Sequence, residues 1–551
     1  MPDIDYSQSS ILIIESTEIY RGILKKILTD IGVEDIRVTS TGKDAIAACQ
    51  EALFEVIFCD FELGRGKTGL QVLEELRTSE FIKPSCIFAM ITAEVDKSIV
   101  LSCLEHKPSL FITKPFTHNG LKNRLDKIFE LHTYLRPIIS AIDDQEYKLA
   151  LLLCDKELKS DSRYPAWCVK TQCELLFKIK AYEPCIEACR AALTLKAHTW
   201  AQLLLGKALC ATEQHDLALH TFNALYSGES INVDGIEAFD EAAQIHFQKG
   251  ESETAQVLLQ QATELSGLSV PRLLTLADLC EQNDDVIAAT KVYRNVAKHA
   301  EYSMHACPDN QLDFARSLTE SAARSDHVQS KILIAEALTT INKVNRSFND
   351  NNTRVRSGLL ASQAYSSIDE SEKANQLLKK ALVNYNELSD AEKNIDVKVE
   401  LVRTYVMTDN QDKADTLMKE VNRCSEFSTK LASRIDRVSE EPVSRSGKSE
   451  VVKINNKGIT FYNAKEFNKA ITYFSKALKR FPKHIGIRLN LAQALIAQLN
   501  VQGPDAVLIQ QCRDDLDHLN HITSTHPQYH RLTELTEKIN VCQKELDIEV
   551  L

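Results

Sequence analysis

Glu55-Val56-Ile57-Phe58-Cys59-Asp60 is the stretch that decides the fold of the first part of this 551-residue chain. Its four consecutive apolar residues are typical of a strand that is buried on both faces of a parallel sheet. The run ends in a carboxylate, Asp60. Comparable apolar runs occupy residues 10–14, 36–40, 86–91 and 110–113.

Amphipathic segments separate these runs and predict helices at residues 19–31, 43–53, 70–78, 95–104 and 117–129. Five strand-helix units in about 120 residues predict a doubly wound, five-stranded parallel sheet with helices on both faces. In such a sheet the ligand site lies beyond the carboxyl ends of the strands. The side chains expected there are Glu15, Asp60, Thr92 and Lys114.

These four side chains suit the transfer of a phosphoryl group onto Asp60. Phosphoryl transfer depends mainly on positioning and on neutralising charge around the moving group. Lys114 can neutralise a phosphoryl oxygen as a point charge, and the Thr92 hydroxyl can donate to another. Magnesium prefers oxygen ligands, so the carboxylates of Glu15 and Asp60 suit that ion.

Residues 9–130 resemble the receiver domain of bacterial two-component response regulators. The resemblance rests on Ile14-Glu15, Asp60, Ile91-Thr92-Ala93 and Lys114-Pro115-Phe116. It implies a flavodoxin-like fold and a cis Lys114–Pro115 bond. At Phe111 it implies an aromatic switch position, with an ordinary strand aromatic as the alternative. It also implies that Asp60 accepts a phosphoryl group from a histidine kinase or phosphotransfer protein, assisted by bound Mg²⁺.

Two features depart from the family pattern: residue 16 and the loop at residues 61–69. Ser16 stands where receivers carry a second acidic metal ligand, which weakens the expected magnesium site. Glu62 lies where the family supplies a main-chain carbonyl to the metal, and its carboxylate either compensates for Ser16 or is a solvated loop residue. The loop at residues 61–69 carries glycines and one extra residue, and we interpret it as a variant of the family loop.

Beyond about residue 140 the strand pattern ends and helical segments recur. The clearest unit, residues 456–482, carries small residues at Gly458, Ala470 and Ala477 and aromatic residues at Phe461, Phe467 and Phe474. It resembles the 34-residue tetratricopeptide repeat, in which small residues let paired helices approach closely. Degenerate copies lie upstream, although the template fails at residues 300–350, where plain antiparallel helices are the alternative.

The sequence therefore predicts a repeat array at residues 140–438, a linker at 439–450 and a C-terminal repeat unit at 451–551. The linker prediction rests on a polar stretch rich in Pro, Gly and Ser. Stacked helical hairpins form a concave surface that usually binds a peptide or protein. No motif identifies that ligand.

Bulk composition bounds the partners and the compartment. A net charge of -12 argues against nucleic acid as the main partner, and no apolar run approaches the ~18 residues of a membrane span. Fifteen scattered cysteines without a CxxC pair suggest a reducing, cytoplasmic compartment. A metal at Cys185 and Cys189, or at Cys103 and His106, is the weaker alternative to buried thiols.

Two functional interpretations remain open. In the first, the protein is a response regulator whose phosphate on Asp60 shifts the packing of residues 95–129 and acts through residues 131–142 on a protein-binding array. In the second, it is a constitutive scaffold with a vestigial, non-phosphorylated receiver, which Ser16 favours. No catalytic constellation stands out in the helices, so we expect no enzyme activity beyond the receiver's own phosphorylation and dephosphorylation.

Overall fold

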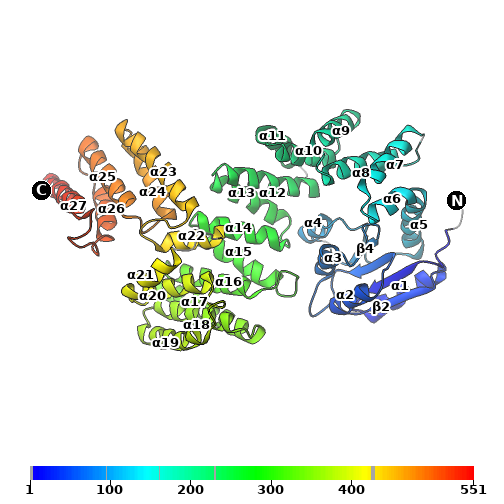
Figure 1. The fold of residues 1–551 in the computed structure, drawn as a ribbon, viewed down its shortest axis with the longest axis horizontal. Coiled ribbons are helices and arrows are strands. Elements are labelled where there is room, and N and C mark those ends of the chain that lie inside the picture. Colours follow the sequence, from blue (N-terminus) through cyan, green and yellow to red (C-terminus); the bar gives the residue numbers. More distant parts are fainter. Residues whose placement is uncertain (1–3, 95, 161, 229–230, 423–427, 551) are drawn as a thin grey trace. The chain divides into compact units, whose positions relative to one another are not determined.

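The computed structural model describes residues 4–94, 96–160, 162–228, 231–422 and 428–550. The chain divides into two compact units, one of residues 1–279 and 292–310 and the other of residues 280–291 and 311–551. The division falls inside the helical region. The first unit therefore holds the whole sheet together with the first helices that follow it (Figure 1).

The five predicted strands form one parallel sheet in the order β2-β1-β3-β4-β5, which confirms the predicted fold. The strands are β1 (Ser10–Ile14), β2 (Asp35–Thr39), β3 (Val56–Asp60), β4 (Ile87–Thr92) and β5 (Leu110–Thr113). All residues of β1, β3 and β4 except Ser10 are buried, which explains their continuous apolar runs. Because every pair is parallel, all five carboxyl ends lie at one edge.

Helices cover both faces of the sheet. They are α1 (Glu18–Asp30), α2 (Gly42–Glu51), α3 (Gly69–Thr78), α4 (Lys97–Glu105) and α5 (His118–Tyr134). Leu24 of α1 and Leu121 of α5 share a core with Ile11, whereas Cys103 of α4 shares the opposite core with Leu12. Neighbouring strand residues face opposite sides, so each apolar run supplies both cores.

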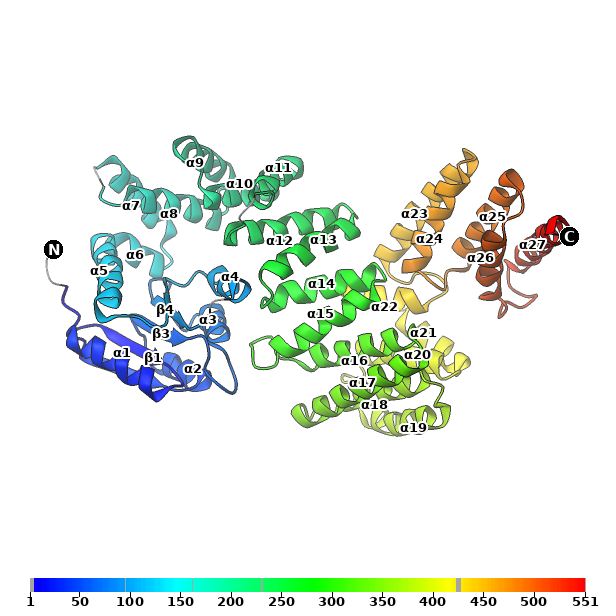
Figure 2. The same ribbon diagram turned by 180° about the vertical axis from the view of Figure 1, so that it is seen from behind.

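Every element of the described chain after α5 is a helix, and successive helices pair as hairpins (Figures 1 and 2). The next helices are α6 (Arg136–Asp143), α7 (Tyr147–Lys159), α8 (Pro165–Lys178), α9 (Tyr182–Leu195), α10 (Thr199–Ala211), α11 (His215–Tyr226), α12 (Val233–Gln248), α13 (Ser252–Leu265), α14 (Val270–Gln282) and α15 (Val286–His299).

The turns between paired helices recur at intervals of about one helical hairpin. Each turn holds one residue in the left-handed region, at Gln145, Lys180, Glu213, Gly250 and Asp284, with φ between 58° and 79°. These positions lie 33 to 37 residues apart. The common interval shows that the same turn closes successive hairpins, as expected for a repeat array.

Two distant hairpins also share the same close helix contact. A Cβ atom on Gly206 would lie 2.3 Å from Cε1 of Phe222, and one on Gly458 would lie 2.5 Å from Cε1 of Phe474. Both phenylalanines are fully buried. Glycine is therefore required at these positions because an aromatic ring from the next helix fills the space of its side chain.

We expect Gly458→Ala to lower the free energy of unfolding. Forcing a methyl group against the buried Phe474 ring costs about 1–3 kcal/mol, and better helix propensity returns less than about 1 kcal/mol of this. Urea unfolding of the two variants tests the expectation. Gly22→Ala is the matched control because a Cβ there meets nothing within 4 Å, so it should be neutral or stabilising. Equal effects at both sites would contradict the packing argument.

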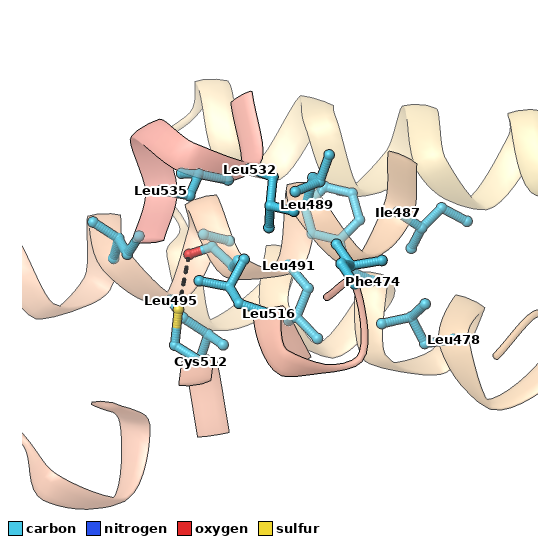
Figure 3. Packing of buried hydrophobic residues seen from close by; sticks show 14 of the residues in the cluster. Phe474, Leu478, Ile487, Leu489, Leu491, Leu495, Cys512, Leu516, Leu532 and Leu535 are labelled. Atoms are coloured by element: carbon cyan, nitrogen blue, oxygen red, sulfur yellow. Dashed lines mark hydrogen bonds between the residues drawn. The ribbon is translucent and has the colours of Figure 1, made fainter. Parts of the chain in front are cut away.

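The second unit continues the helical pattern. Its elements are α16 (Pro308–Ala322, from Gln311 on), α17 (His327–Ser347), α18 (Asn351–Ser366), α19 (Ser371–Glu387), α20 (Ile395–Met407), α21 (Gln411–Val421), α22 (Thr429–Val438), α23 (Arg445–Asn463), α24 (Phe467–Arg480), α25 (Ile485–Gln502), α26 (Ala506–Asp517) and α27 (Tyr529–Val550). Figure 3 shows Phe474, Leu491 and Leu516 in the core of its last helices. There the Cys512 thiol lies 3.8 Å from the Ala492 carbonyl oxygen.

The segment predicted as a linker at 439–450 is partly helical. Residues 439–444 connect α22 to α23, and the helix begins at Arg445 behind the N-cap Ser444. The carboxylate of Asp436 accepts hydrogen bonds from the main-chain N–H groups of Val443 and Ser444 at 2.8 and 2.9 Å. These bonds hold residues 439–444 in place. The polar composition of the segment therefore reflects the capping of a helix as well as a turn.

Three further sequence expectations concern the helices and the cysteines. No helix in the part of the chain that the structure describes is long and apolar enough to cross a membrane. The described cysteines are free thiols, and most of them are buried. No cluster of three or more His, Cys, Asp or Glu side chains suitable for a metal occurs among the described residues. Cys185 and Cys189 are buried in the core on α9.

Candidate functional site

Three charged side chains meet at the carboxyl-terminal edge of the sheet. Lys114 Nζ lies 2.7 Å from Glu15 Oε2 and 2.9 Å from Asp60 Oδ2. Glu15 is fully buried and Asp60 is 5% exposed. Glu15 follows β1, Asp60 ends β3 and Lys114 follows β5, so the parallel sheet brings together residues 45 to 99 positions apart. The convergence expected of these three residues is present.

The surroundings of this cluster change the acidity of its groups. Burial raises the pKa of Asp60 to about 6, against the lowering effect of the hydrogen bond from Lys114 and with the help of the Glu15 charge. Burial alone would lower the pKa of Lys114, but its hydrogen bonds to Glu15 and Asp60 raise it. Above about pH 6 Asp60 is therefore mostly ionised, in a cluster with two acidic side chains and one basic side chain that is suited to attract a cation.

We expect Asp60→Asn to be more stable than the wild type in magnesium-free buffer at about pH 8. The folded-state pKa of Asp60 lies above its ordinary value of 3.8, so its contribution to stability is complete below about pH 4 and is lost as the pH rises through about 6. The neutral amide should recover about 1–3 kcal/mol at high pH. Unfolding measured across this pH range tests the sign. A stability difference that grows as the pH falls would contradict it.

The end of β1 is bonded to the loop that follows Asp60. The Ser16 hydroxyl donates a hydrogen bond to the main-chain carbonyl of Glu62 at 3.1 Å, which holds the end of β1 against the loop after Asp60. The Glu62 side chain itself is exposed. The carboxylates of Glu15 and Asp60 and, in residues close to them in sequence, the Ser16 hydroxyl and the Glu62 carbonyl are all oxygen donors. Such a set fits a magnesium ion that keeps several waters, with one carboxylate fewer than the resemblance implies.

Thr92 and Lys114 lie on adjacent strand ends. Thr92 is 2% exposed, and its hydroxyl oxygen accepts a hydrogen bond from the N–H of Glu94 at 2.9 Å. The Lys114 N–H donates to the Thr92 carbonyl at 2.8 Å. The Lys114–Pro115 peptide bond is cis, as the resemblance implies. Phe111, on β5, is half-buried and packs on the sheet face that α4 covers.

The loop after Asp60 depends on a glycine. A Cβ atom on Gly69 would lie 2.1 Å from the Asp60 carbonyl oxygen, so no other residue fits this approach of the chain to itself. Gly64 and Gly66 have φ of 76° and 111°, which side chains rarely tolerate. Thr68 then caps α3 in a capping box. The glycines of this variant loop therefore have a structural cause.

Two residues of α1 also belong to the site and were not predicted from the sequence. Lys114 Nζ lies 4.2 Å from the centroid of the Tyr20 ring, a favourable contact between a cation and an aromatic face. Arg21 donates to the carbonyl oxygens of Glu15 and Ser16, each at 2.9 Å. One feature of the sequence could have indicated their role: both residues lie in the first turn of the helix that follows Glu15.

Helices of the first unit bind α4 from outside the sheet domain. Arg272, 6% exposed, forms ion pairs with Glu105 at the end of α4 and with Asp240 of α12. Beside it the hydroxyl groups of Ser102 and Ser266 lie 2.9 Å apart, and both serines are buried. Arg272 therefore joins the sheet domain to the repeat helices through a buried network.

Further contacts extend this interface to α3. The Gln71 amide donates to the His299 carbonyl at 2.8 Å, and His305 Nε2 lies 2.8 Å from a carboxylate oxygen of Glu74. The Ser85 hydroxyl donates to Asp143 at 2.6 Å. Sequence reasoning missed this interface because its partners are 58 to 231 residues apart. The available signal was Arg272 near the start of an apolar helix, because an arginine in such a place usually needs an acidic partner.

Comparison with known proteins gives matches to both parts of the chain. The sequence profile of the response regulator receiver domain matches residues 11–126. The chemotaxis protein CheY-3 of Vibrio cholerae is 31% identical over 120 residues, which are 22% of this chain and 91% of that protein. The chemotaxis protein CheY of Pseudomonas aeruginosa is 28% identical over 120 residues, 22% of this chain and 95% of that protein.

Among solved structures, the C-terminal part of a TPR repeat-containing protein from Cytophaga hutchinsonii is 11% identical. It covers 52% of this chain and 99% of its own length, with a TM-score of 0.32.

Proposed function

Because this chain belongs to the response regulator receiver domain family through residues 11–126, we propose that it is a phosphorelay response regulator that accepts a phosphoryl group on Asp60. The donor is a histidine kinase or phosphotransfer protein, and the output is a helical array that binds another protein. The observation that carries this proposal is the buried contact of Lys114 with both Asp60 and Glu15. It supplies the charge neutralisation that phosphoryl transfer requires.

In the proposed reaction an oxygen of the Asp60 carboxylate attacks the phosphorus of a phosphohistidine. A P–O bond to Asp60 forms, the P–N bond breaks, and the released imidazole nitrogen takes up a proton. Lys114 and Thr92 contact oxygens of the transferred group. Glu15, Asp60 and the Glu62 carbonyl would hold magnesium, and the ion would neutralise further charge when bound.

The proposed signal leaves the site through Thr92. If its hydroxyl turns to a phosphoryl oxygen, it stops accepting the hydrogen bond from the Glu94 N–H. Glu94 in turn accepts from the Asp96 N–H at 3.4 Å, and Asp96 caps the first turn of α4. The other end of α4 is Glu105, so a shift of this helix acts on the contact with Arg272.

The sequence alone led to a different route, in which the packing of residues 95–129 shifts and acts on the array through residues 131–142. Val95 lies outside the described residues. The remaining part of that expectation stands beside the α4 route, because α5 runs to Tyr134 and α6 begins at Arg136. Both routes remain proposals.

Hydrogen exchange with and without beryllium fluoride, a phosphoryl mimic, tests the proposal. We expect the mimic to change the exchange of α4 and of residues 266–272 in the wild type and to change neither in Asp60→Ala. An unchanged pattern in the wild type, with the mimic bound, would reject the α4 route.

A constitutive scaffold is the second candidate. Ser16 favours it, because the site then has one carboxylate fewer for a divalent cation than the family pattern. The two candidates predict different outcomes of chemical phosphorylation, which is the first result considered in the Discussion.

A further inference from the structure

An arginine-lined pocket lies in the second unit, remote in sequence from the phosphorylation chemistry. Its volume is about 280 Å³, and helices α16, α20 and α22 supply most of its wall. Four arginines line it: Arg324, Arg403, Arg434 and Arg437. In a chain with a net charge of -12, such a concentration of guanidinium groups requires an explanation.

Carboxylates hold these guanidinium groups in place. Asp284 lies 2.6 Å from Arg324 and also pairs with Arg437. Arg403 pairs with Glu320 at 2.5 Å. Because each arginine is already oriented by a carboxylate, little side-chain freedom remains to be lost when an anion enters.

Arg434 is held in the same way, at 3.0 Å from Glu281. Burial would raise the pKa of Glu320, but the charges of Arg403 and Arg437 outweigh burial and lower it to about 2. Glu320 therefore stays ionised near neutral pH.

The charge of the pocket suits one monovalent anion. Among the described residues that line the pocket, four are arginines and two, Glu281 and Glu320, are carboxylates, so the lining is positively charged. Carboxylates outside the lining also contact these arginines: Asp284 pairs with Arg324 and Arg437, and Asp313 lies 3.0 Å from Arg434. A single carboxylate adds less negative charge beside Glu281 and Glu320 than a phosphoryl dianion would, so the pocket favours the monovalent group.

The uncharged part of the lining suits a peptide. Ala323, Val406, Met407 and Val438 line the same pocket as the arginines. A bidentate guanidinium contact with a carboxylate, beside apolar side chains that can cover its methylene groups, is the usual chemistry of a peptide anchor. The Arg324 side chain is 49% exposed, so the pocket is accessible from solvent.

We propose that this pocket binds an acidic segment of a partner protein and seats one Asp or Glu carboxylate among the four arginines. The site gives a ligand class to the protein-binding role proposed above, and it rests on that role alone. Phosphorylation of Asp60 is not required for the pocket to form.

Fluorescence anisotropy with the full-length, unphosphorylated protein tests the site. The probe is a labelled short peptide of Glu and Leu with a blocked C-terminus, and a matching peptide of Lys and Leu serves as the negative probe. We expect the acidic peptide to bind with an affinity that falls as salt rises, and the basic peptide not to bind. Arg324→Gln should weaken binding about tenfold, because it removes a charged partner.

Arg346→Gln is the matched control, since it makes the same change at an exposed arginine in α17 of the same unit. It should alter the affinity less than about twofold. Arg324→Lys should give an intermediate affinity, because it keeps the charge and loses the planar fork. Thermal unfolding of each variant separates lost binding from lost folding, and Arg437→Gln supplies a second test from inside the pocket.

Three outcomes would overturn the proposal: no binding of the acidic peptide by the folded wild type, equal weakening by Arg324→Gln and Arg346→Gln, or displacement of the peptide by inorganic phosphate better than by glutamate. The last would assign the pocket to phosphate. The same titration with Asp60→Ala should give the wild-type affinity, so failure of the phosphorelay proposal and failure of the pocket proposal are distinguishable.

Discussion

Incubation with acetyl phosphate and magnesium should add one phosphoryl group to the wild-type protein and none to Asp60→Ala. Asp60 is the carboxylate in contact with Lys114, and the pKa of about 6 leaves most of it ionised and nucleophilic at neutral pH. Intact-protein mass spectrometry detects the gain, and its lability in base and hydroxylamine identifies an acyl phosphate. Lys114→Ala should slow the reaction by about 10²–10³-fold, since it removes a preorganised cation from the transition state.

Ser16→Asp is the informative companion variant. It places a second carboxylate beside Glu15, and we expect tighter magnesium binding and a phosphorylation rate about tenfold higher. If the wild type gains no mass while Ser16→Asp does, the natural protein has a site too poor in carboxylates to react, and the scaffold interpretation holds. If neither gains mass although both are folded, Asp60 is not an acceptor.

Arg272→Ala should destabilise the first unit by about 2–4 kcal/mol. The substitution leaves Glu105 and Asp240 facing each other without the cation that both contact, and removal of one partner from a buried ion pair costs more than the pair contributes. We expect faster hydrogen exchange in α4 and in residues 266–272, together with a lower midpoint of urea unfolding.

Lys107→Ala is the control for this prediction, because Lys107 also bridges α4's end and α12, through Glu237, but its side chain is 63% exposed. An exposed pair contributes less than about 1 kcal/mol. If Arg272→Ala and Lys107→Ala have equally small effects, the buried network does not join the two parts of the unit.

The sheet and its site could be read from the sequence because their determinants are local. Four apolar residues before Asp60 define a buried strand, and the parallel arrangement then fixes which strand ends meet. The positions of Glu15 and Lys114 follow from this topology alone. The resemblance to the receiver family, and not the topology, identified Ser16 as the residue that separates this site from its family pattern.

The interface through Arg272 could not be predicted in the same way. Its ion pair with Glu105 joins residues 167 positions apart, and no periodic pattern specifies such a partner. The hairpin turns could not be located from the sequence either. Gln145, Lys180 and Glu213 adopt the left-handed conformation there, and glycine is the residue that usually indicates it. At residues 445–450 composition suggested a linker, whereas the Ser444 cap and the Asp436 bonds start a helix.

The contacts that cover one face of α4 make it difficult to transfer the receiver alone to another protein. A fragment that ends with α5 would expose the Ser102 hydroxyl and the Glu105 carboxylate, which Ser266 and Arg272 now cover. The amides of α4 should exchange hydrogen faster in such a fragment than in a longer piece that ends near residue 310, where the first compact unit closes. Exchange of this receiver for another during evolution would break these contacts unless the helices that carry Ser266 and Arg272 were exchanged with it.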